Sequence, residues 1–209
     1  MTEIEDLVVG EDGRARCGWG AAPDLYLHYH DTEWGRPELD DQRLFEKLCL
    51  EGFQAGLSWL TILRKRPAFR AAFADFHIET VAGFDDADVA RLLDDAGIVR
   101  HRGKIEATIT NARAALEVQG DEGSMRDLMW RFRPEAPRRV RSLGEVPVTT
   151  GESDALSKEL KRRGFRFVGP TTMYALMQAM GMVNDHLVGC WLHAEVGELQ
   201  DGVTRTGAG

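Results

Sequence analysis

Two side chains near the C-terminus, His186 and Cys190, stand four residues apart in the segment VNDHLVGCW. On a helix this spacing places them on one face about one turn apart, which is how a helix offers two ligands to a borderline metal ion. A closed tetrahedral zinc site needs four ligands, so two more must come from elsewhere. The spacing predicts half of a metal site, with plain packing of the two side chains as the alternative.

Further nitrogen and sulfur ligands occur near the N-terminus, in RCGWGAAPDLYLHYHDTEWG. Cys17 and His30 are the candidates, and His28 competes with His30. Because the termini of compact domains often lie close together, this pair could join His186 and Cys190 in a Cys₂His₂ zinc site. Four protein ligands leave no open position for water or substrate, so such a site would be structural.

A second group of residues combines a carboxylate with aromatic rings. LEGFQAGLSW holds Glu51 and Trp59 eight residues apart, and LYLHYHDTEW adds Tyr26, Tyr29 and Trp34. An aromatic face attracts a cation, and a carboxylate accepts hydrogen bonds from one. Glutamates at helix ends are more often exposed and tryptophans at helical spacing more often lie in the core, so the residue types alone leave both interpretations open.

Helical periodicity dominates the elements that must position these residues. Apolar side chains recur every three or four residues, and no alternation typical of strands persists. The pattern predicts helices over 40–53, 54–66, 66–76, 85–97, 102–120, 125–132, 153–164 and 170–181. A connector rich in Pro, Arg and Thr follows residue 132. The fold class is therefore predicted to be all-α.

The last two predicted helices are joined by the short segment GFRFVG, in which Gly164 and Gly169 are the outer residues. Ser153 is the expected N-cap of the first helix, and Pro170 suits the first position of the second. In a helix-hairpin-helix unit the N–H groups at the start of the second helix face an anion such as a DNA phosphate. An ordinary αα-hairpin is the alternative. The residues expected to face DNA are Gly164, Phe165, Arg166, Gly169 and Thr171, flanked by the basic Lys161, Arg162 and Arg163.

Composition limits the class of protein and its partners. The 209 residues carry a net charge of −8, which disfavours a nucleic acid as binding partner. Basic residues nevertheless outnumber acidic ones over 91–166, so a local basic surface could still bind phosphates. No apolar run approaches the ~20 residues of a membrane span, and the N-terminus lacks the features of a signal peptide. Three cysteines argue against a disulfide framework. We expect a cytoplasmic monomer with an acidic disordered tail at 1–15, one domain at 16–194 and a flexible tail at 195–209.

Several long blocks of this sequence resemble the bacterial DNA-3-methyladenine glycosylase I family. They are RCGW with YHDTEWG, LFEKLCLEGFQAGLSW, DAGIVRHRGKI, SDALSKELKRRGFRFVG and GMVNDHLVGC, together spanning about residues 16–191. The resemblance implies a helix-hairpin-helix DNA glycosylase fold with one structural zinc ion that joins the N- and C-terminal segments. The implied zinc ligands are Cys17, His30, His186 and Cys190, which leaves His28 and Cys49 as non-ligands.

The resemblance also implies a reaction, the hydrolysis of the N-glycosidic bond of 3-methyladenine in alkylated double-stranded DNA. The products would be free 3-methyladenine and an abasic site. Attached to the sugar, this base is a cation and already a good leaving group, so no strong general acid is needed. The implied roles are hydrogen bonding of the base edge by Glu51, which serves as the catalytic and substrate-binding carboxylate, and stacking by Tyr29 and Trp59. Tyr26 and Trp34 are further expected pocket residues.

Two other positions near these motifs have expected roles. Gly56 and Leu57 precede Trp59 and could fill the gap left by a flipped nucleotide, as apolar wedges do in other DNA-bending proteins. Asp185 comes sixteen residues after Gly169, fewer than the superfamily's spacing of roughly twenty, and we interpret it as a capping or supporting residue rather than a catalytic one.

Two different classes of protein remain as alternatives. A zinc-stabilised DNA-binding module would explain the basic clusters but not the carboxylate among aromatic rings. A metal-dependent hydrolase or deaminase would need an open coordination position, which four protein ligands exclude. A lyase activity would need an amine nucleophile, and near the Glu51 and Tyr29 motifs only Lys47 could supply one.

Overall fold

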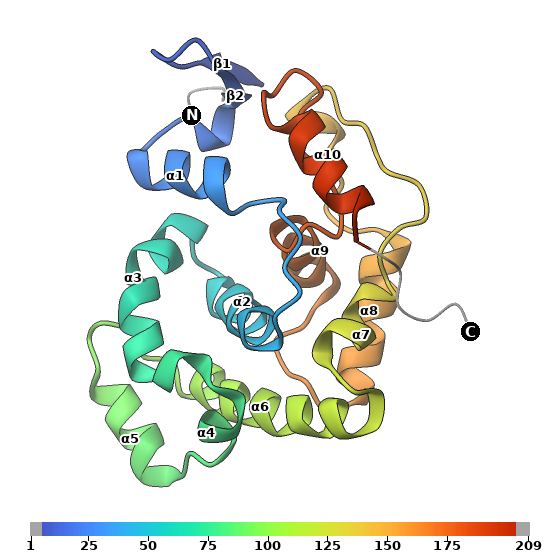
Figure 1. Ribbon diagram of the computed structural model, residues 1–209. Helices are drawn as coiled ribbons and strands as arrows, with labels where there is room; N and C mark the ends of the chain where they lie inside the picture. Colours follow the sequence, from blue (N-terminus) through green and yellow to red (C-terminus); the bar gives the residue numbers. More distant parts are fainter. Residues whose placement is uncertain (1–5, 204–209) are drawn as a thin grey trace.

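The computed structural model describes residues 6–203, and most of them are helical (Figure 1). None of the helices within this range is long and apolar enough to cross a membrane. The elements are β1 (Leu7–Val9), β2 (Ala15–Cys17), η1 (Gly18–Gly20), α1 (Asp24–Thr32), α2 (Asp41–Gln54), α3 (Trp59–Ala72), η2 (Ala74–Phe76), α4 (Ile78–Ala82), α5 (Asp86–Asp94), α6 (Arg102–Glu122), α7 (Met125–Trp130), η3 (Leu143–Glu145), α8 (Gly151–Arg162), α9 (Pro170–Ala179) and α10 (His193–Asp201). The predicted all-α class is confirmed apart from the short β1–β2 pair.

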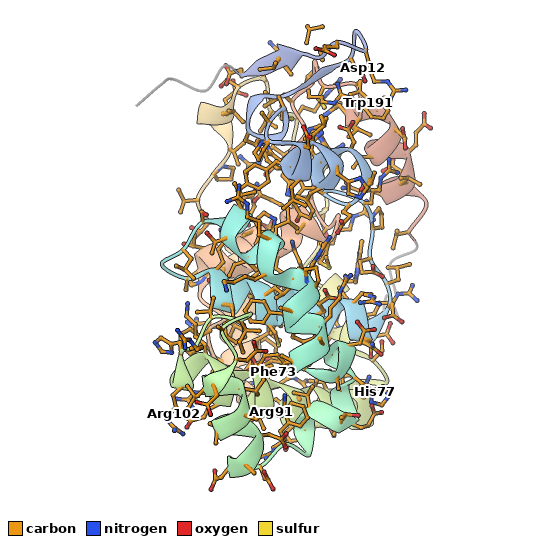
Figure 2. All side chains as sticks on the ribbon, turned by 90° about the vertical axis from the view of Figure 1, so that its left-hand side faces the viewer. Asp12, Phe73, His77, Arg91, Arg102 and Trp191 are labelled. Atoms are coloured by element: carbon orange, nitrogen blue, oxygen red, sulfur yellow. The ribbon has the colours of Figure 1, made fainter. Side chains whose placement is uncertain are left out.

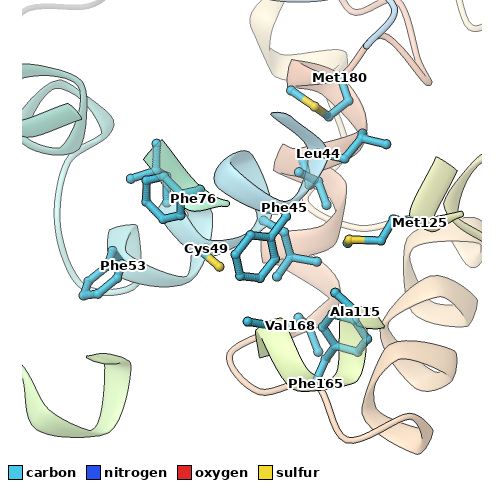
Figure 3. Packing of buried hydrophobic residues seen from close by; sticks show 14 of the residues in the cluster. Leu44, Phe45, Cys49, Phe53, Phe76, Ala115, Met125, Phe165, Val168 and Met180 are labelled. Carbon is cyan, nitrogen blue, oxygen red and sulfur yellow. The ribbon is translucent and has the colours of Figure 1, made fainter. Parts of the chain in front are cut away.

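Helix α2 is the centre of the core and packs against α3, α6, α7 and α9. It begins at the N-cap Asp40, whose side chain accepts a hydrogen bond from the Arg43 backbone N–H. Figure 3 shows Phe45 of α2 among buried side chains from several elements. Because α2 is covered on nearly all sides, its polar residues Lys47 and Glu51 are buried as well and must find partners inside the protein.

The molecule has two ends that differ in composition. In Figure 2, Asp12 and Trp191 lie at one end, where the N- and C-terminal segments meet. Phe73, Arg91 and Arg102 lie toward the other end, which α3 to α6 form (Figures 1 and 2). The aromatic side chains of that end pack in a buried stack of Phe53, Phe69, Phe73, Phe76 and Phe84. The phenylalanines that recur at 69, 73 and 76 in the sequence therefore form part of the hydrophobic core.

Helices α8 and α9 pack against each other and are joined by a short segment, an arrangement that both the predicted helix-hairpin-helix unit and an ordinary αα-hairpin would give. The first helix starts earlier than expected, because Thr150 is the N-cap and Ser153 sits three residues later in a reciprocal capping box. Pro170 takes the first position of α9, as predicted. Gly164 has φ +89°, a left-handed conformation that ends α8 and that residues with a Cβ rarely adopt.

Both tails are more ordered than the sequence indicated. Residues 7–9 and 15–17 form an antiparallel pair, and Leu7 packs on the small apolar cluster around Cys17 and Leu192. At the other end α10 continues to Asp201, because Val196 is fully buried and Gln200 donates hydrogen bonds to the Gly35 and Val183 carbonyls. The domain thus extends beyond residues 16–194 on both sides; residues 1–5 and 204–209 of the predicted tails lie outside the described range.

Candidate functional site

The four predicted metal ligands lie together in the structure. Cys17, His30, His186 and Cys190 are all buried, and one ligand atom of each lies within 4.8 Å of the others. Cys190 Sγ is 3.6 Å from His30 Nε2 and 3.7 Å from His186 Nδ1, and Cys17 Sγ is 3.9 Å from the same His186 nitrogen. Zinc bonds of ~2.0–2.3 Å place tetrahedral ligands about 3.3–3.8 Å apart. The donor set therefore fits a metal ion.

Hydrogen bonds outside the cluster fix which ring nitrogen of each histidine faces it. His30 Nδ1 lies 2.8 Å from an Asp31 carboxylate oxygen, and His186 Nε2 lies 3.1 Å from the Trp34 carbonyl oxygen. Each of these nitrogens donates its proton outward, so His30 Nε2 and His186 Nδ1 keep their lone pairs for the cluster. Such oriented imidazoles are typical of metal sites.

Local sequence explains how the N-terminal half of the cluster is held. Arg16 is buried beside Cys17 and donates hydrogen bonds to Asp12 and Asp31. Burial alone would raise the pKa of Asp31, but the hydrogen bonds from Arg16 and His30 lower it, so the carboxylate stays charged against the His30 ring. Gly20 packs against that ring, since a Cβ there would lie 2.5 Å from His30 Cδ2.

The two competing ligands are excluded by their positions. His28 is exposed on α1, and it is not part of the buried Cys/His group. Cys49 is buried on α2 in the large apolar core, and burial raises the pKa of its thiol. The assignment of both as non-ligands therefore agrees with the structure.

A cavity of about 410 Å³ lies next to the metal cluster and collects the predicted aromatic and carboxylate residues. Tyr29 and Trp59 line it side by side, with ring centroids 5.6 Å apart and ring planes tilted by 48°. Glu51, Tyr26 and Trp34 also line this cavity. Tyr26 ties α1 to the start of α3, because its hydroxyl accepts a hydrogen bond from the Leu60 backbone N–H. All five predicted pocket residues thus meet in one place.

Glu51 is the acidic centre of this cavity wall. Its side chain is 5 % exposed, and burial raises the pKa of its carboxyl group while Lys47 counteracts that rise. Lys47 Nζ lies 3.4 Å from Glu51 Oε1 and donates a hydrogen bond of 2.5 Å to the Tyr29 hydroxyl. A buried carboxylate facing aromatic rings can bind a flat cation that offers hydrogen-bond donors.

Other cavity residues were not predicted from the sequence. Trp19 packs edge-on against Trp34 at 4.8 Å and against Tyr26, and Gln54 and Gln178 also reach the lining. Trp19 follows Cys17 by two residues, and this position near a predicted metal ligand is the feature of the sequence that could have identified it as a cavity residue. The two glutamines carry no signal of this kind, because amide side chains on helices are usually exposed.

Asp185 also lines the cavity, which the sequence interpretation did not anticipate. Its Oδ2 accepts hydrogen bonds from the Tyr174 hydroxyl at 2.5 Å and from Gln178 at 2.9 Å. Its Oδ1 has no hydrogen-bond partner among the described residues, although the atom is buried. The side chain therefore supports the wall through Tyr174 and Gln178 and adds a second negative group beside the cavity.

A larger cavity of about 520 Å³ lies between the connector after α7 and the segments around Asn184 and Gln200. Its lining includes Pro134, Pro137 and Arg138 together with Tyr174. It does not contain the aromatic pair or the buried glutamate of the smaller cavity. Size alone therefore does not identify the functional site, and the chemistry of the smaller cavity does.

The turn between α2 and α3 borders the base of the same region. A groove of about 210 Å³ is lined by Glu51, Gly56, Leu57 and Thr171 among others, so the predicted turn and the start of α9 meet beside the cavity. Leu57 is 42 % exposed. Lys104 of α6 holds this turn by donating hydrogen bonds to the Phe53 and Ala55 carbonyls at 2.8 and 2.6 Å.

The hairpin between α8 and α9 is anchored from α6. Asn111 accepts a hydrogen bond from the Arg166 N–H and donates one to the Arg166 carbonyl, which leaves the exposed Arg166 side chain directed away from the core. Gly169 is the N-cap of α9, and no side chain caps that helix end. The Phe165 side chain is buried, so a DNA contact at this position would be made by its backbone.

Several basic residues that the sequence grouped together have structural partners instead. Arg162 and Arg163 both pair with Glu159, and Arg163 also pairs with Glu122. Lys65, in the basic run 64–66, donates hydrogen bonds to the Ala96 and Gly97 carbonyls in the turn that follows α5. Basic clusters in this sequence therefore partly serve helix packing, and the exposed Lys161 and Arg166 remain as side chains suited to a phosphate.

Comparison with known proteins gives a consistent picture. The family model for methyladenine glycosylase matches residues 19–193. DNA-3-methyladenine glycosylase 1 of Escherichia coli K12 is 53 % identical over 177 residues, which cover 84 % of this chain and 95 % of that protein. DNA-3-methyladenine glycosylase of Haemophilus influenzae is 47 % identical over 177 residues, with coverage of 84 % and 96 %.

Solved structures agree with the sequence matches. A crystal structure of 3-methyladenine DNA glycosylase I (TAG) superimposes with a TM-score of 0.82 at 50 % identity, covering 85 % of this chain and 99 % of the other. The Staphylococcus aureus enzyme, described in a study of 3-methyladenine recognition, gives a TM-score of 0.80 at 37 % identity, with coverage of 83 % and 94 %.

Proposed function

This chain belongs to the methyladenine glycosylase family and is a DNA glycosylase of 3-methyladenine, and we propose that Glu51, Tyr29 and Trp59 are the residues that bind the damaged base. The observation that carries this proposal is the burial of Glu51 in a cavity that is also lined by the neighbouring rings of Tyr29 and Trp59. A cavity of about 410 Å³ is large enough for a purine.

The chemistry of the substrate explains why a cavity without a strong general acid is enough for cleavage. In DNA, 3-methyladenine carries a positive charge that weakens its bond to the sugar, so cleavage needs no strong acid to protonate the base. The nucleotide is rotated out of the duplex and its base enters the cavity. Tyr29 and Trp59 stack on the cation, and the Glu51 carboxylate accepts hydrogen bonds from its edge. Water then replaces the base at the sugar and leaves an abasic site.

Selection against normal adenine follows from the same carboxylate. Adenine is neutral, so it offers Glu51 no opposite charge when water is excluded from the cavity. With adenine bound, the buried carboxylate keeps the Lys47 ammonium as a charged neighbour but gains no second one, whereas the methylated base adds an opposite charge on the cavity side. The same charge relationship favours the methylated cation over the far more abundant undamaged base.

We infer that the Cys17, His30, His186 and Cys190 group holds one structural zinc ion. The mixed sulfur and nitrogen donors, their burial and the outward hydrogen bonds of both histidines support zinc. Four protein donors leave the ion no reactive role. Bound zinc would fix α1, whose Tyr29 forms one wall of the cavity, and would join it to the C-terminal segment.

DNA is the expected partner, contacted by the hairpin around Gly164, Arg166 and Gly169 and by the turn at Gly56 and Leu57. The groove beside the cavity is lined by Gly56 and Leu57 of the turn and by Thr171 at the start of α9, directly after the hairpin, which supports a single binding face. Monofunctional cleavage is supported by the burial of Lys47, because its amine is absent from the cavity lining. A monomeric state and a cytoplasmic location stay predictions.

Release of free base from DNA treated with a methylating agent tests the function directly. We expect the purified protein to release 3-methyladenine and to leave alkali-sensitive abasic sites without cutting the strand itself. Binding of DNA with no base release would instead favour the zinc-stabilised binding module. Strand cleavage with a covalent adduct that borohydride traps would contradict monofunctional action.

A further inference from the structure

Lys47 is a buried ammonium group that the proposed reaction does not use. It is 6 % exposed and contacts each of the three residues assigned to base binding. Its Nζ donates a hydrogen bond of 2.5 Å to the Tyr29 hydroxyl, lies 3.4 Å from Glu51 Oε1 and stands 3.6 Å from the centre of the Trp59 ring. A cation over the face of an indole ring at this distance interacts with the same π electrons that would attract a cationic base.

The position of Lys47 is behind the cavity wall rather than inside the cavity. The lining of the 410 Å³ cavity includes Tyr29, Glu51 and Trp59 but not Lys47. Lys47 instead lines a separate cavity of about 190 Å³ together with Tyr29 and Glu33. The ammonium and a base in the larger cavity therefore share the same aromatic wall and the same carboxylate from different sides.

The charged groups around Lys47 come from three helices. Glu51 lies on its own helix α2, Tyr29 and Glu33 come from the end of α1, and Arg66 comes from α3 and forms an ion pair with Glu33 at 2.5 Å. Glu51 and Glu33 favour the ammonium, whereas Arg66 opposes it. Burial has the largest effect and lowers the pKa of Lys47 to about 8, so the amine is mostly charged at neutral pH.

We propose that Lys47 is a specificity-determining residue whose charge lowers the preference of the cavity for a cationic base over a neutral one. This inference rests on the proposed function. The base changes from cation to neutral molecule during the reaction, since the electron pair of the broken glycosidic bond passes to the ring. A positive charge behind the wall disfavours the bound cation before cleavage, and it has little effect on the neutral base afterwards.

Two small probes separate the two charge states. 3,9-Dimethyladeninium is a permanent cation that carries a methyl group where the sugar would be, and free 3-methyladenine is neutral above about pH 7. Isothermal titration calorimetry gives the dissociation constant of each. A unit charge about 7 Å away changes binding of a cation by roughly tenfold in a partly screened site, so we expect Lys47→Met to raise the ratio of cation to neutral affinity roughly tenfold.

Three comparisons distinguish charge from structure. Lys47→Gln keeps a donor for the Tyr29 hydroxyl without the charge, so it should raise the ratio as Lys47→Met does. Lys158→Met makes the same replacement at an exposed lysine of α8 and should leave the ratio unchanged. In the unsubstituted protein the ratio should also rise between about pH 7 and about pH 9 as Lys47 loses its proton. If the affinity ratio of Lys47→Met rises by the same amount over this pH range, a titratable group other than Lys47 causes the pH dependence.

The outcomes separate this inference from the proposed function. If neither probe binds the unsubstituted protein, the base cavity itself is wrongly assigned. If both bind but the ratio is the same in Lys47→Met, or if both affinities fall in equal proportion, Lys47 is only a structural residue. If Lys47→Gln has the same ratio of cation to neutral affinity as the unsubstituted protein, the change seen in Lys47→Met comes from the lost hydrogen bond to Tyr29. That result would overturn the role of charge. Should the variants fail to fold, a flat pH profile of the unsubstituted protein would overturn it as well.

Discussion

Cys17 Sγ lies 3.9 Å from His186 Nδ1, although 169 positions separate the two residues in the chain. Helix α1, which follows Cys17, carries both His30 of the proposed metal group and Tyr29 of the cavity proposed to bind the base. The metal group and the cavity therefore share one helix, and removing the metal is expected to disturb the base-binding wall as well as the fold.

Loss of one metal ligand should remove the metal and lower stability. We expect His30→Gln to reduce bound zinc from one equivalent to nearly none, by elemental analysis, and to lower the melting temperature by about 10 °C, which corresponds to several kcal/mol for a protein of this size. His28→Gln changes the same residue type on the same helix at an exposed position and should keep the full equivalent. A metal-free native protein of unchanged stability would refute the site.

Removal of the Glu51 charge should weaken both base binding and catalysis. A hydrogen bond to a charged group contributes about 1.5–3 kcal/mol, so we expect Glu51→Gln to lower affinity for 3,9-dimethyladeninium by about 10- to 100-fold. Release of 3-methyladenine from alkylated DNA should fall at least as much. Glu79→Gln, at a side chain that is 65 % exposed, is the matched control. Equal affinities for Glu51→Gln and the control would remove Glu51 from the site.

The pH dependence of cation binding should report the buried carboxyl group. Burial raises the pKa of Glu51, so the group is protonated at a higher pH than an exposed glutamate, which titrates near about 4.3. Affinity for the permanent cation should therefore fall as pH decreases through this raised pKa, and the rise expected from loss of the Lys47 proton is a separate step at higher pH. Glu51→Gln should show no such fall. The same acid profile in both proteins would assign the titration to a different group.

Leu57 should matter for duplex DNA but not for the free base. It is 42 % exposed in the turn before α3 and borders the groove next to the cavity. If it fills the gap left by the flipped nucleotide, Leu57→Ala should slow release of base from duplex DNA roughly tenfold, since unstacking one step costs a few kcal/mol. Affinity for free 3-methyladenine should not change. Leu39→Ala, at a comparably exposed leucine, should leave both measurements unchanged.

The sequence predicted the helices, and it singled out residues that the structure brings together at the cavity and in the Cys/His group, because both depend on local or chemically distinctive signals. Periodic apolar residues mark α2 and α9, and Gly164 and Pro170 mark the hairpin between α8 and α9. The sequence has only three cysteines and six histidines, so few combinations of possible metal ligands had to be considered. The resemblance then selected Glu51 from many glutamates, a choice that helical periodicity alone could not make.

The errors and omissions depend on contacts between distant segments. Val196 is buried and Gln200 bonds to carbonyls near residues 35 and 183, so α10 continues where the composition indicated a flexible tail. Lys47 appeared to be an ordinary helical lysine, and only the packing of α1 and α3 against α2 reveals that it is buried beside Tyr29 and Trp59. Partners of this kind leave no pattern within a single segment.

The order in which the chain is synthesised gives the metal group another consequence. His186 and Cys190 leave the ribosome last among the ligands, and Gln178 and Asp185 of the cavity lining emerge with them. A nascent or truncated chain that stops before this stretch has the aromatic wall and Glu51 but lacks half of the proposed metal ligands. We therefore expect competence to recognise a lesion to be acquired only near the end of translation, and a prematurely terminated chain to be inert rather than an enzyme with relaxed selectivity.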